Sequence, residues 1–188
     1  MRRLPFEKWE GLGNDFVVAF EADGWRPDDD ARAIALCDRH RGIGADGLLL
    51  VSLDPPRMRV INADGSEAEM CGNGLRCVAA AVAARAGEAR AQRTFVAGPD
   101  RWPTTVEAGE EVAVVFPPPE LGKDAAGGLA AWQTEAGAGV PVSTGNPHWV
   151  FVEPPANVDL DVAGPRLEHD PRFPHRTNVE FVRPSGAG

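Results

Sequence analysis

One apolar segment constrains the fold of this chain more than any other. Between Gly74 and Gly87, apolar side chains recur with the spacing of one face of an α-helix, at Leu75, Val78, Ala79, Val82 and Ala83. Gly87 is a typical stop signal for such a helix. The sequence therefore predicts a helix that starts near Gly74 and packs an alanine-rich apolar face into the core.

Strand-like runs lie on both sides of this helix. We expect strands at 4–9, 15–20, 48–53, 57–62, 94–97, 111–116, 140–143 and 149–152. An earlier helix is expected over ARAIALCDRH (31–40), with Ile34 and Cys37 on one apolar face and Gly42 as its stop.

The composition changes at FPPPELGKDAAGGLAAW (116–132), where prolines are followed by glycine and alanine. Such a stretch is typical of a connection between domains. We therefore place a first domain at 1–117 and the beginning of a second at 118–188. The second segment is short for an independent domain.

The bulk properties exclude several classes of protein. The 188 residues carry a net charge of −9, so the chain lacks a general attraction to nucleic acid or to an anionic membrane. No apolar run reaches the roughly 20 residues of a membrane span, and the N-terminus lacks the apolar run of a signal peptide. The three cysteines form no CxxC pair, which argues against a disulfide framework. We expect a cytoplasmic protein.

The hexapeptide GIGADG (42–47) has the glycine spacing of a dinucleotide-binding loop. That function requires a strand before the glycines and a helix after them. Here the predicted order is reversed, with a helix before and a strand after. The favoured interpretation is a helix end that runs into a tight loop.

Cys71 lies in MCGNGLRC (70–77), directly before the predicted helix. A helix N-terminus presents unpaired N–H groups and a partial positive charge, and both favour a thiolate over a thiol. Gly72 and Gly74 let the backbone approach a ligand closely, and the same N–H groups can hold a carboxylate. This stretch can supply a thiolate base and an anion site together; a buried, inert cysteine is the alternative.

The other two cysteines have the pattern of core residues. Cys77 follows the buried register of the helix, and Cys37 lies within the apolar face of the earlier one. A zinc site built from Cys37, His40, Cys71 and Cys77 is the competing interpretation. We expect no metal, because CxxH with an isolated Cys-x5-Cys is weak beside paired CxxC motifs.

Five stretches of the sequence resemble the diaminopimelate epimerase family. They are GLGNDFVV (11–18), RHRGIGADGLLLV (39–51), NADGSEAEMCGNGLRC (62–77), TGNPHWV (144–150) and FPHRTNVEF (173–181). They keep the family's order, and CGNG distinguishes this family from proline-racemase-like relatives, which usually carry CGHG. The resemblance implies two pseudo-symmetric α+β domains, each with a curved mixed sheet wrapped around a central helix. It also implies a homodimer.

By this resemblance, the activity is the interconversion of LL- and meso-2,6-diaminopimelate, a step toward lysine and the cell wall. One cysteine thiolate removes the Cα proton, and a second cysteine on the opposite face returns a proton, without a cofactor. Pyridoxal phosphate would need a Schiff-base lysine, and neither Lys8 nor Lys123 lies in a matching motif as a candidate. Placed N–H donors and exclusion of water would stabilise the carbanion instead.

The resemblance also assigns roles to individual residues. Cys71 corresponds to the first acid/base cysteine, and His148 to a histidine that supports catalysis. Substrate contacts are implied for Asn14, Gly47, Asn62, Gly72, Asn73, Asn146 and Asn178. Asparagine suits this work because its amide both donates and accepts without adding charge. Gly47 stands where the family often has glutamine, so that contact is absent or is made by the backbone.

The family's other cysteine lies in a block of the type ACGTG, beyond the position of TNVEF, and the sequence ends at Gly188 before such a block. We therefore expect an incomplete epimerase that does not turn over substrate by itself. Two alternatives remain: a non-catalytic amino-acid-binding or interaction module of the same fold, and an epimerase for another amino acid, such as histidine.

Overall fold

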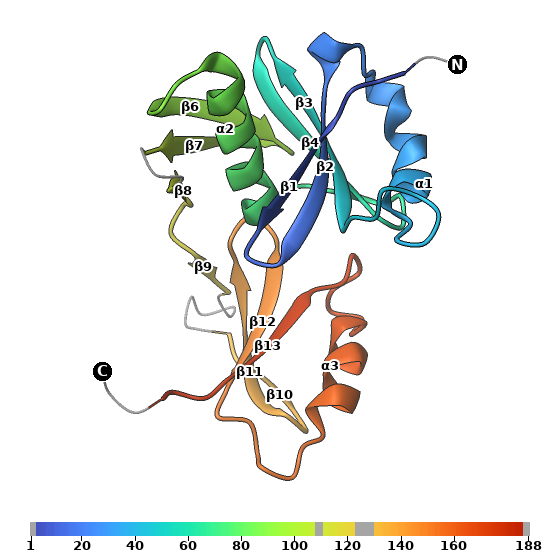
Figure 1. Ribbon diagram of the computed structural model, residues 1–188. Coiled ribbons are helices and arrows are strands. Elements are labelled where there is room, and N and C mark those ends of the chain that lie inside the picture. Colours follow the sequence, from blue (N-terminus) through green and yellow to red (C-terminus); the bar gives the residue numbers. More distant parts are fainter. Residues whose placement is uncertain (1–2, 108–110, 123–129, 186–188) are drawn as a thin grey trace. The chain divides into compact units, whose positions relative to one another are not determined.

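The computed structural model describes residues 3–107, 111–122 and 130–185 of the chain. The chain divides into two compact units, residues 1–116 and residues 117–188 (Figure 1). Within the described residues, no helix is both long and apolar enough to cross a membrane.

The first unit is built on a mixed sheet of eight strands in the order β1-β2-β3-β4-β6-β7-β8, with β5 paired to β4. The pairs β2/β3 and β4/β6 are parallel, and the others are antiparallel. The strands are β1 (Glu7–Gly11), β2 (Asn14–Phe20), β3 (Gly47–Leu53), β4 (Pro56–Asn62), β5 (Glu67–Ala68), β6 (Ala91–Ala97), β7 (Asp100–Val106) and β8 (Val112–Val114).

The helix predicted from the apolar spacing is confirmed as α2 (Gly72–Ala86), drawn in green in Figure 1. It starts two residues before Gly74 and ends at Gly87, whose φ of 68° is left-handed. All five apolar residues of the predicted face are buried, and Cys77 and Ala81 are buried with them. Because most of these side chains are small, α2 packs closely against strands from both ends of the sheet, including β1, β2, β7 and β8.

The opposite face of β2, β3 and β4 is covered by a shorter helical segment. Here a 3-10 turn (Pro27–Arg32) leads into α1 (Ala33–Cys37), which packs on β3. The sheet is therefore covered on both faces, which explains the continuous apolar run of β3. Leu48 and Leu50 face the α1 side, and Leu49 and Val51 face the α2 side.

The prediction of a helix over residues 31–40 is confirmed only for Ala33–Cys37, and the placement of Ile34 on its apolar face is wrong. The helix has five residues, Cys37 is buried, and Ile34 is 56% exposed. The backbone N–H groups of residues 42–45 donate to the carbonyls of Leu36, Cys37 and Asp38, so the loop itself closes the helix end. This is the helix-end interpretation of GIGADG, and the strand β3 follows it directly.

The second unit holds a five-stranded mixed sheet in the order β10-β11-β12-β13, with β9 paired to β11. The strands are β9 (Glu120–Leu121), β10 (Trp132–Thr134), β11 (Gly137–Ser143), β12 (Pro147–Val152) and β13 (Asn178–Val182). The helix α3 (Leu160–Glu168) connects β12 to β13, which run parallel, and it packs on β13. The core is aromatic, with Trp149 and Phe151 fully buried between Trp132, Phe173 and Phe181.

Candidate active site

Cys71 is the N-cap residue of α2. Its backbone is extended, with φ −139° and ψ 110°, and its carbonyl accepts from the Leu75 N–H at 2.8 Å. Its Sγ atom accepts from the Gly74 N–H at 3.4 Å, so the sulfur occupies the place of a capping oxygen. The residue is half-buried, and it lies at a helix end, which favours negative charge.

The other two thiols differ from Cys71 in burial. Burial raises the pKa of the Cys77 thiol to about 11, and the neighbouring Cys71 adds to the rise. Burial also raises the pKa of the Cys37 thiol. Both groups therefore keep their protons near neutral pH and are poor bases.

The structure does not bring together the four residues of the competing zinc interpretation. Cys77 packs in the cluster on the α2 side of the sheet, and Cys37 packs in the cluster on the α1 side. Among the described residues, no group of three or more His, Cys, Asp and Glu side chains could hold a metal ion.

Two of the predicted substrate-binding asparagines meet beside Cys71. Asn14 is the first residue of β2, and Asn73 lies in the first turn of α2. The Asn73 Nδ2 donates to the Asn14 Oδ1 at 3.4 Å, and the Arg76 guanidinium donates to the Asn73 Oδ1. Gly72 precedes Asn73, and the ring of Phe116 lies so close that a Cβ at Gly72 would come within 2.9 Å of it.

Gly47 and Asn62 lie at the same end of the sheet as Asn14. In the β-ladder Gly47 is opposite Phe16 on β2 and opposite Asn62 on β4. A Cβ at Gly47 would lie 2.9 Å from the Ile61 carbonyl oxygen, so a side chain there would displace β4. The Asn62 Nδ2 donates to the Ser66 Oγ at 3.0 Å and thereby holds the turn after β4.

Sequence reasoning missed a charged cluster beneath this end of the sheet. Arg39 bridges Asp15 at 2.6 Å and Asp46 at 2.8 Å, and Lys8 also binds Asp15. Asp15 and Asp46 are joined further, because each backbone N–H donates to an oxygen of the other residue. The hydrogen bond from Arg39 holds the pKa of the Asp15 carboxyl well below its usual range. The cluster ties the start of β2 to the start of β3.

The second unit places the remaining predicted residues around His148 on β12. The His148 Nδ1 lies 2.7 Å from the Glu180 Oε1, and the Nε2 lies 2.9 Å from the Asn146 Oδ1 and 3.1 Å from the Thr144 Oγ. Asn178 is opposite His148 in the parallel ladder and donates to the Pro147 carbonyl at 3.2 Å. Asn146 and His148 line a hollow of about 330 Å³, which Phe173 also borders.

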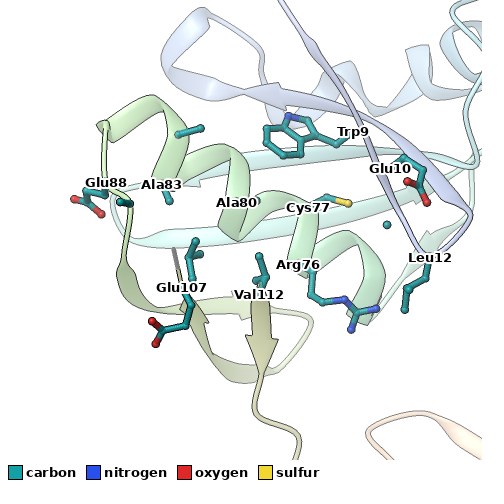
Figure 2. A pocket seen from close by; sticks show the side chains of 14 residues that line it. Trp9, Glu10, Leu12, Arg76, Cys77, Ala80, Ala83, Glu88, Glu107 and Val112 are labelled. Atoms are coloured by element: carbon teal, nitrogen blue, oxygen red, sulfur yellow. The ribbon is translucent and has the colours of Figure 1, made fainter. Parts of the chain in front are cut away.

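A larger hollow, of about 600 Å³, runs along α2 in the first unit. Figure 2 shows Trp9 of β1 on one side of the helix and Val112 of β8 on the other, with Cys77 and Ala80 between them. Neither Cys71 nor any of the predicted asparagines lines this hollow. Its wall combines alanine and other apolar side chains with the charged Glu10, Arg76, Glu88 and Glu107, and none of the residues that line it is an asparagine or a glutamine.

Comparisons with known proteins point to one family. A family model described as diaminopimelate epimerase matches residues 6–118. A diaminopimelate epimerase of Microcystis aeruginosa is 40% identical over an alignment of 212 positions, which covers 96% of this chain and 71% of the relative. The diaminopimelate epimerase of Pelotomaculum thermopropionicum is 40% identical over 206 residues, covering 96% of this chain and 71% of that one.

Solved structures with this fold are more distant in sequence. A phenazine biosynthesis protein of the PhzF family from Bacillus anthracis superposes with a TM-score of 0.64 at 19% identity, covering 98% of this chain and 69% of that chain. A predicted epimerase from Pseudomonas aeruginosa superposes with a TM-score of 0.61 at 17% identity, covering 96% of this chain and 70% of that chain. These likenesses establish the α+β fold that the sequence predicted.

Proposed function

The chain belongs to the diaminopimelate epimerase family, and from this premise we propose that it acts on 2,6-diaminopimelate. The reaction is the interconversion of the LL and meso forms by proton transfer at one Cα. The observation that carries the proposal is the position of Cys71, a half-buried thiol at the N-terminus of α2 beside the Asn14–Asn73 pair.

Cys71 is proposed as the group that exchanges a proton on one face of the substrate. Its thiolate takes the Cα proton and becomes a thiol, and the electron pair of the broken C–H bond is delocalised into the adjoining carboxylate. The first-turn N–H groups of α2 at Gly72 and Asn73 can hold that carboxylate, because helix N-termini bind anions. The capping hydrogen bond from Gly74 supports the thiolate before the transfer.

Substrate recognition is proposed for the amides gathered at this end of the sheet. Arg76 donates to the Asn73 Oδ1 and so fixes the orientation of that amide. Asn14 and Asn73 can each donate to a carboxylate and accept from an ammonium. Gly47 and Asn62 lie on the neighbouring strands and border the same end.

The reaction is proposed to need no pyridoxal phosphate. Lys8 binds the Asp15 carboxylate and donates to the Gly44 carbonyl at 2.6 Å, so its amine is committed to the charged cluster. Lys123 lies outside the described residues. A Schiff base therefore has no candidate lysine among the residues that the structure describes.

A second acid/base group is needed on the opposite face, and neither Cys37 nor Cys77 suits that role. Both are buried with raised pKa values, and Cys37 lies on the far side of the sheet. We propose that the 188-residue polypeptide, assayed by itself, binds substrate without turnover. His148, Asn146 and Asn178 of the second unit are proposed to support catalysis and binding.

The wider setting is proposed from the family. Interconversion of diaminopimelate serves lysine and cell-wall synthesis, a cytoplasmic task. The assembly is proposed to be a homodimer, which light scattering on the purified chain would test by mass.

Binding measured by calorimetry tests the proposed substrate. We expect the chain to bind LL-diaminopimelate more tightly than L-lysine, which lacks the distal carboxylate. Asn73→Ala should weaken binding at least tenfold, whereas Glu153→Gln, at an exposed residue that is none of the proposed site residues, should leave it unchanged. Equal affinity for L-lysine, or no binding of diaminopimelate at millimolar concentration, would overturn the proposal.

A further inference from the structure

We propose that Glu180 is a positioning residue for His148. Its carboxylate accepts a hydrogen bond from the Nδ1–H, so that Nε2 is the nitrogen left to gain and lose a proton at the site. The contact of 2.7 Å between the His148 Nδ1 and the Glu180 Oε1 carries the inference. It deepens the proposed function, and it rests on that function for its catalytic meaning.

The pair is held by two adjacent parallel strands. His148 is opposite Asn178, and Val150 is opposite Glu180, in the ladder between β12 and β13. Because side chains two residues apart share one face of a strand, Glu180 reaches His148 along a common face of the sheet. The Glu180 side chain is 37% exposed and the His148 side chain is 22% exposed, so protein atoms surround most of each.

The other ring nitrogen faces a different kind of neighbour. Nε2 lies within 3.1 Å of the Thr144 hydroxyl and 2.9 Å of the Asn146 amide oxygen, at the hollow of about 330 Å³. In the observed arrangement the Thr144 hydroxyl donates to the Asn146 Oδ1 at 3.0 Å, and both oxygens can accept from a protonated Nε2. Rotation of the hydroxyl, or of the Asn146 amide, presents a donor to an unprotonated Nε2 instead. Nε2 can therefore change its protonation without breaking the Nδ1–Glu180 contact.

Apart from the contact with His148, the Glu180 carboxylate has little to stabilise it. Its second oxygen, Oε2, is buried and has no hydrogen-bond partner among the described residues. A carboxylate oxygen that is buried without a partner costs stability. Stability alone therefore gives no reason for a carboxylate at residue 180. A carboxylate that is hydrogen-bonded to one ring nitrogen of a histidine does commonly fix which nitrogen carries the proton.

Long-range ¹H–¹⁵N NMR of the ¹⁵N-labelled chain tests this directly, at a pH where His148 is neutral. The ring signals are assigned by their loss in His148→Asn. In the wild type we expect a protonated Nδ1 and an unprotonated Nε2. Glu180→Gln should keep that pattern because its amide oxygen still accepts, and Glu180→Ala should lose it. Glu153→Gln is the matched control and should change nothing.

Two results would overturn the inference: a wild-type His148 with its proton on Nε2, or an unchanged tautomer in Glu180→Ala. Thermal unfolding of each variant checks that the second unit is folded. The NMR readout does not depend on substrate. If the tautomers are as expected but diaminopimelate does not bind, the proposed function is refuted and this inference stands.

Discussion

At the scale of single residues, burial separates three chemically identical thiols. Cys71 caps a helix and is half-buried, whereas Cys37 and Cys77 are 3% and 4% exposed within the two core clusters. The same helix that has Cys71 at its N-cap buries Cys77 one and a half turns later. Position along one helix therefore decides which of these two sulfurs is enclosed in the core.

The second unit provides a residue-scale test of packing at Gly139. A Cβ at this residue would lie 2.3 Å from the Trp149 Nε1 and 2.6 Å from the Phe151 ring, and both rings are fully buried. Gly139→Ala should destabilise the unit by about 1–3 kcal/mol, since an overpacked core must shift. Urea unfolding followed by tryptophan fluorescence measures the change.

Gly164 is the matched control, because it lies inside α3 and its added Cβ would meet only Phe181, at 3.8 Å. Gly164→Ala should stabilise the helix by about 0.5–1 kcal/mol. Equal and small effects of the two substitutions would contradict the packing described for β11 and β12.

At the scale of elements, the candidate site depends on how β2, β3 and α2 meet. The charged cluster of Asp15, Arg39 and Asp46 joins the starts of β2 and β3, and the Asn14–Asn73 contact joins β2 to α2. The parallel register of β2 and β3 thus brings residues from three separate motifs to one end of the sheet.

Arg39→Gln tests this connection through its pH dependence. A carboxyl whose folded-state pKa is lowered adds stability above its unfolded pKa, and that stability is lost as pH falls toward the folded pKa. The variant should therefore be less stable than the wild type at neutral pH, and the difference should shrink as pH falls below about 4. Urea unfolding at a series of pH values measures it, and a difference that does not depend on pH would contradict the role given to Asp15.

The sequence was sufficient where local pattern decides structure. The apolar spacing of α2 and the continuous apolar run of β3 identified the core elements, and the glycines around Cys71 indicated the helix start. The strand β7 and the helix α3 were missed because each contains a proline, Pro103 and Pro165, which local rules place outside regular structure. Tertiary packing tolerates both.

The site was only partly predictable for a similar reason. Cys71 was accessible to local reasoning, because helix capping depends on a few adjacent residues. The Arg39 cluster and the Glu180–His148 pair depend on which strands are neighbours and in which register, and local sequence does not determine that. The exposure of Ile34 likewise follows from the loop that closes α1, whose carbonyl contacts are tertiary.

At the scale of the whole molecule, each unit carries part of the candidate chemistry. The first unit holds Cys71 with Asn14 and Asn73, and the second holds His148 with Glu180. The chain spans about 71% of the length of the Microcystis relative. The proposed proton transfer on two faces of a substrate therefore needs an acid/base group in addition to the half-buried Cys71.

An assay with LL-diaminopimelate tests this expectation. We predict that the 188-residue polypeptide by itself produces no meso-diaminopimelate above background, because Cys37 and Cys77 stay protonated and buried. Cα-deuterium exchange in heavy water should likewise be weak or absent. Turnover that is abolished by Cys71→Ala and retained in Cys77→Ala would show instead that one thiol is enough.

Alkylation by iodoacetamide tests the central claim, that Cys71 is the reactive thiol of a diaminopimelate site. We predict a single adduct on Cys71 in the folded chain, at least tenfold faster than on Cys37 or Cys77, and a clear slowing by LL-diaminopimelate but not by L-lysine. Cys71→Ala should abolish the adduct, and Cys37→Ala and Cys77→Ala should keep it, as read by intact mass and peptide mapping. First reaction at Cys77 or Cys37, or no protection by diaminopimelate, would contradict the account.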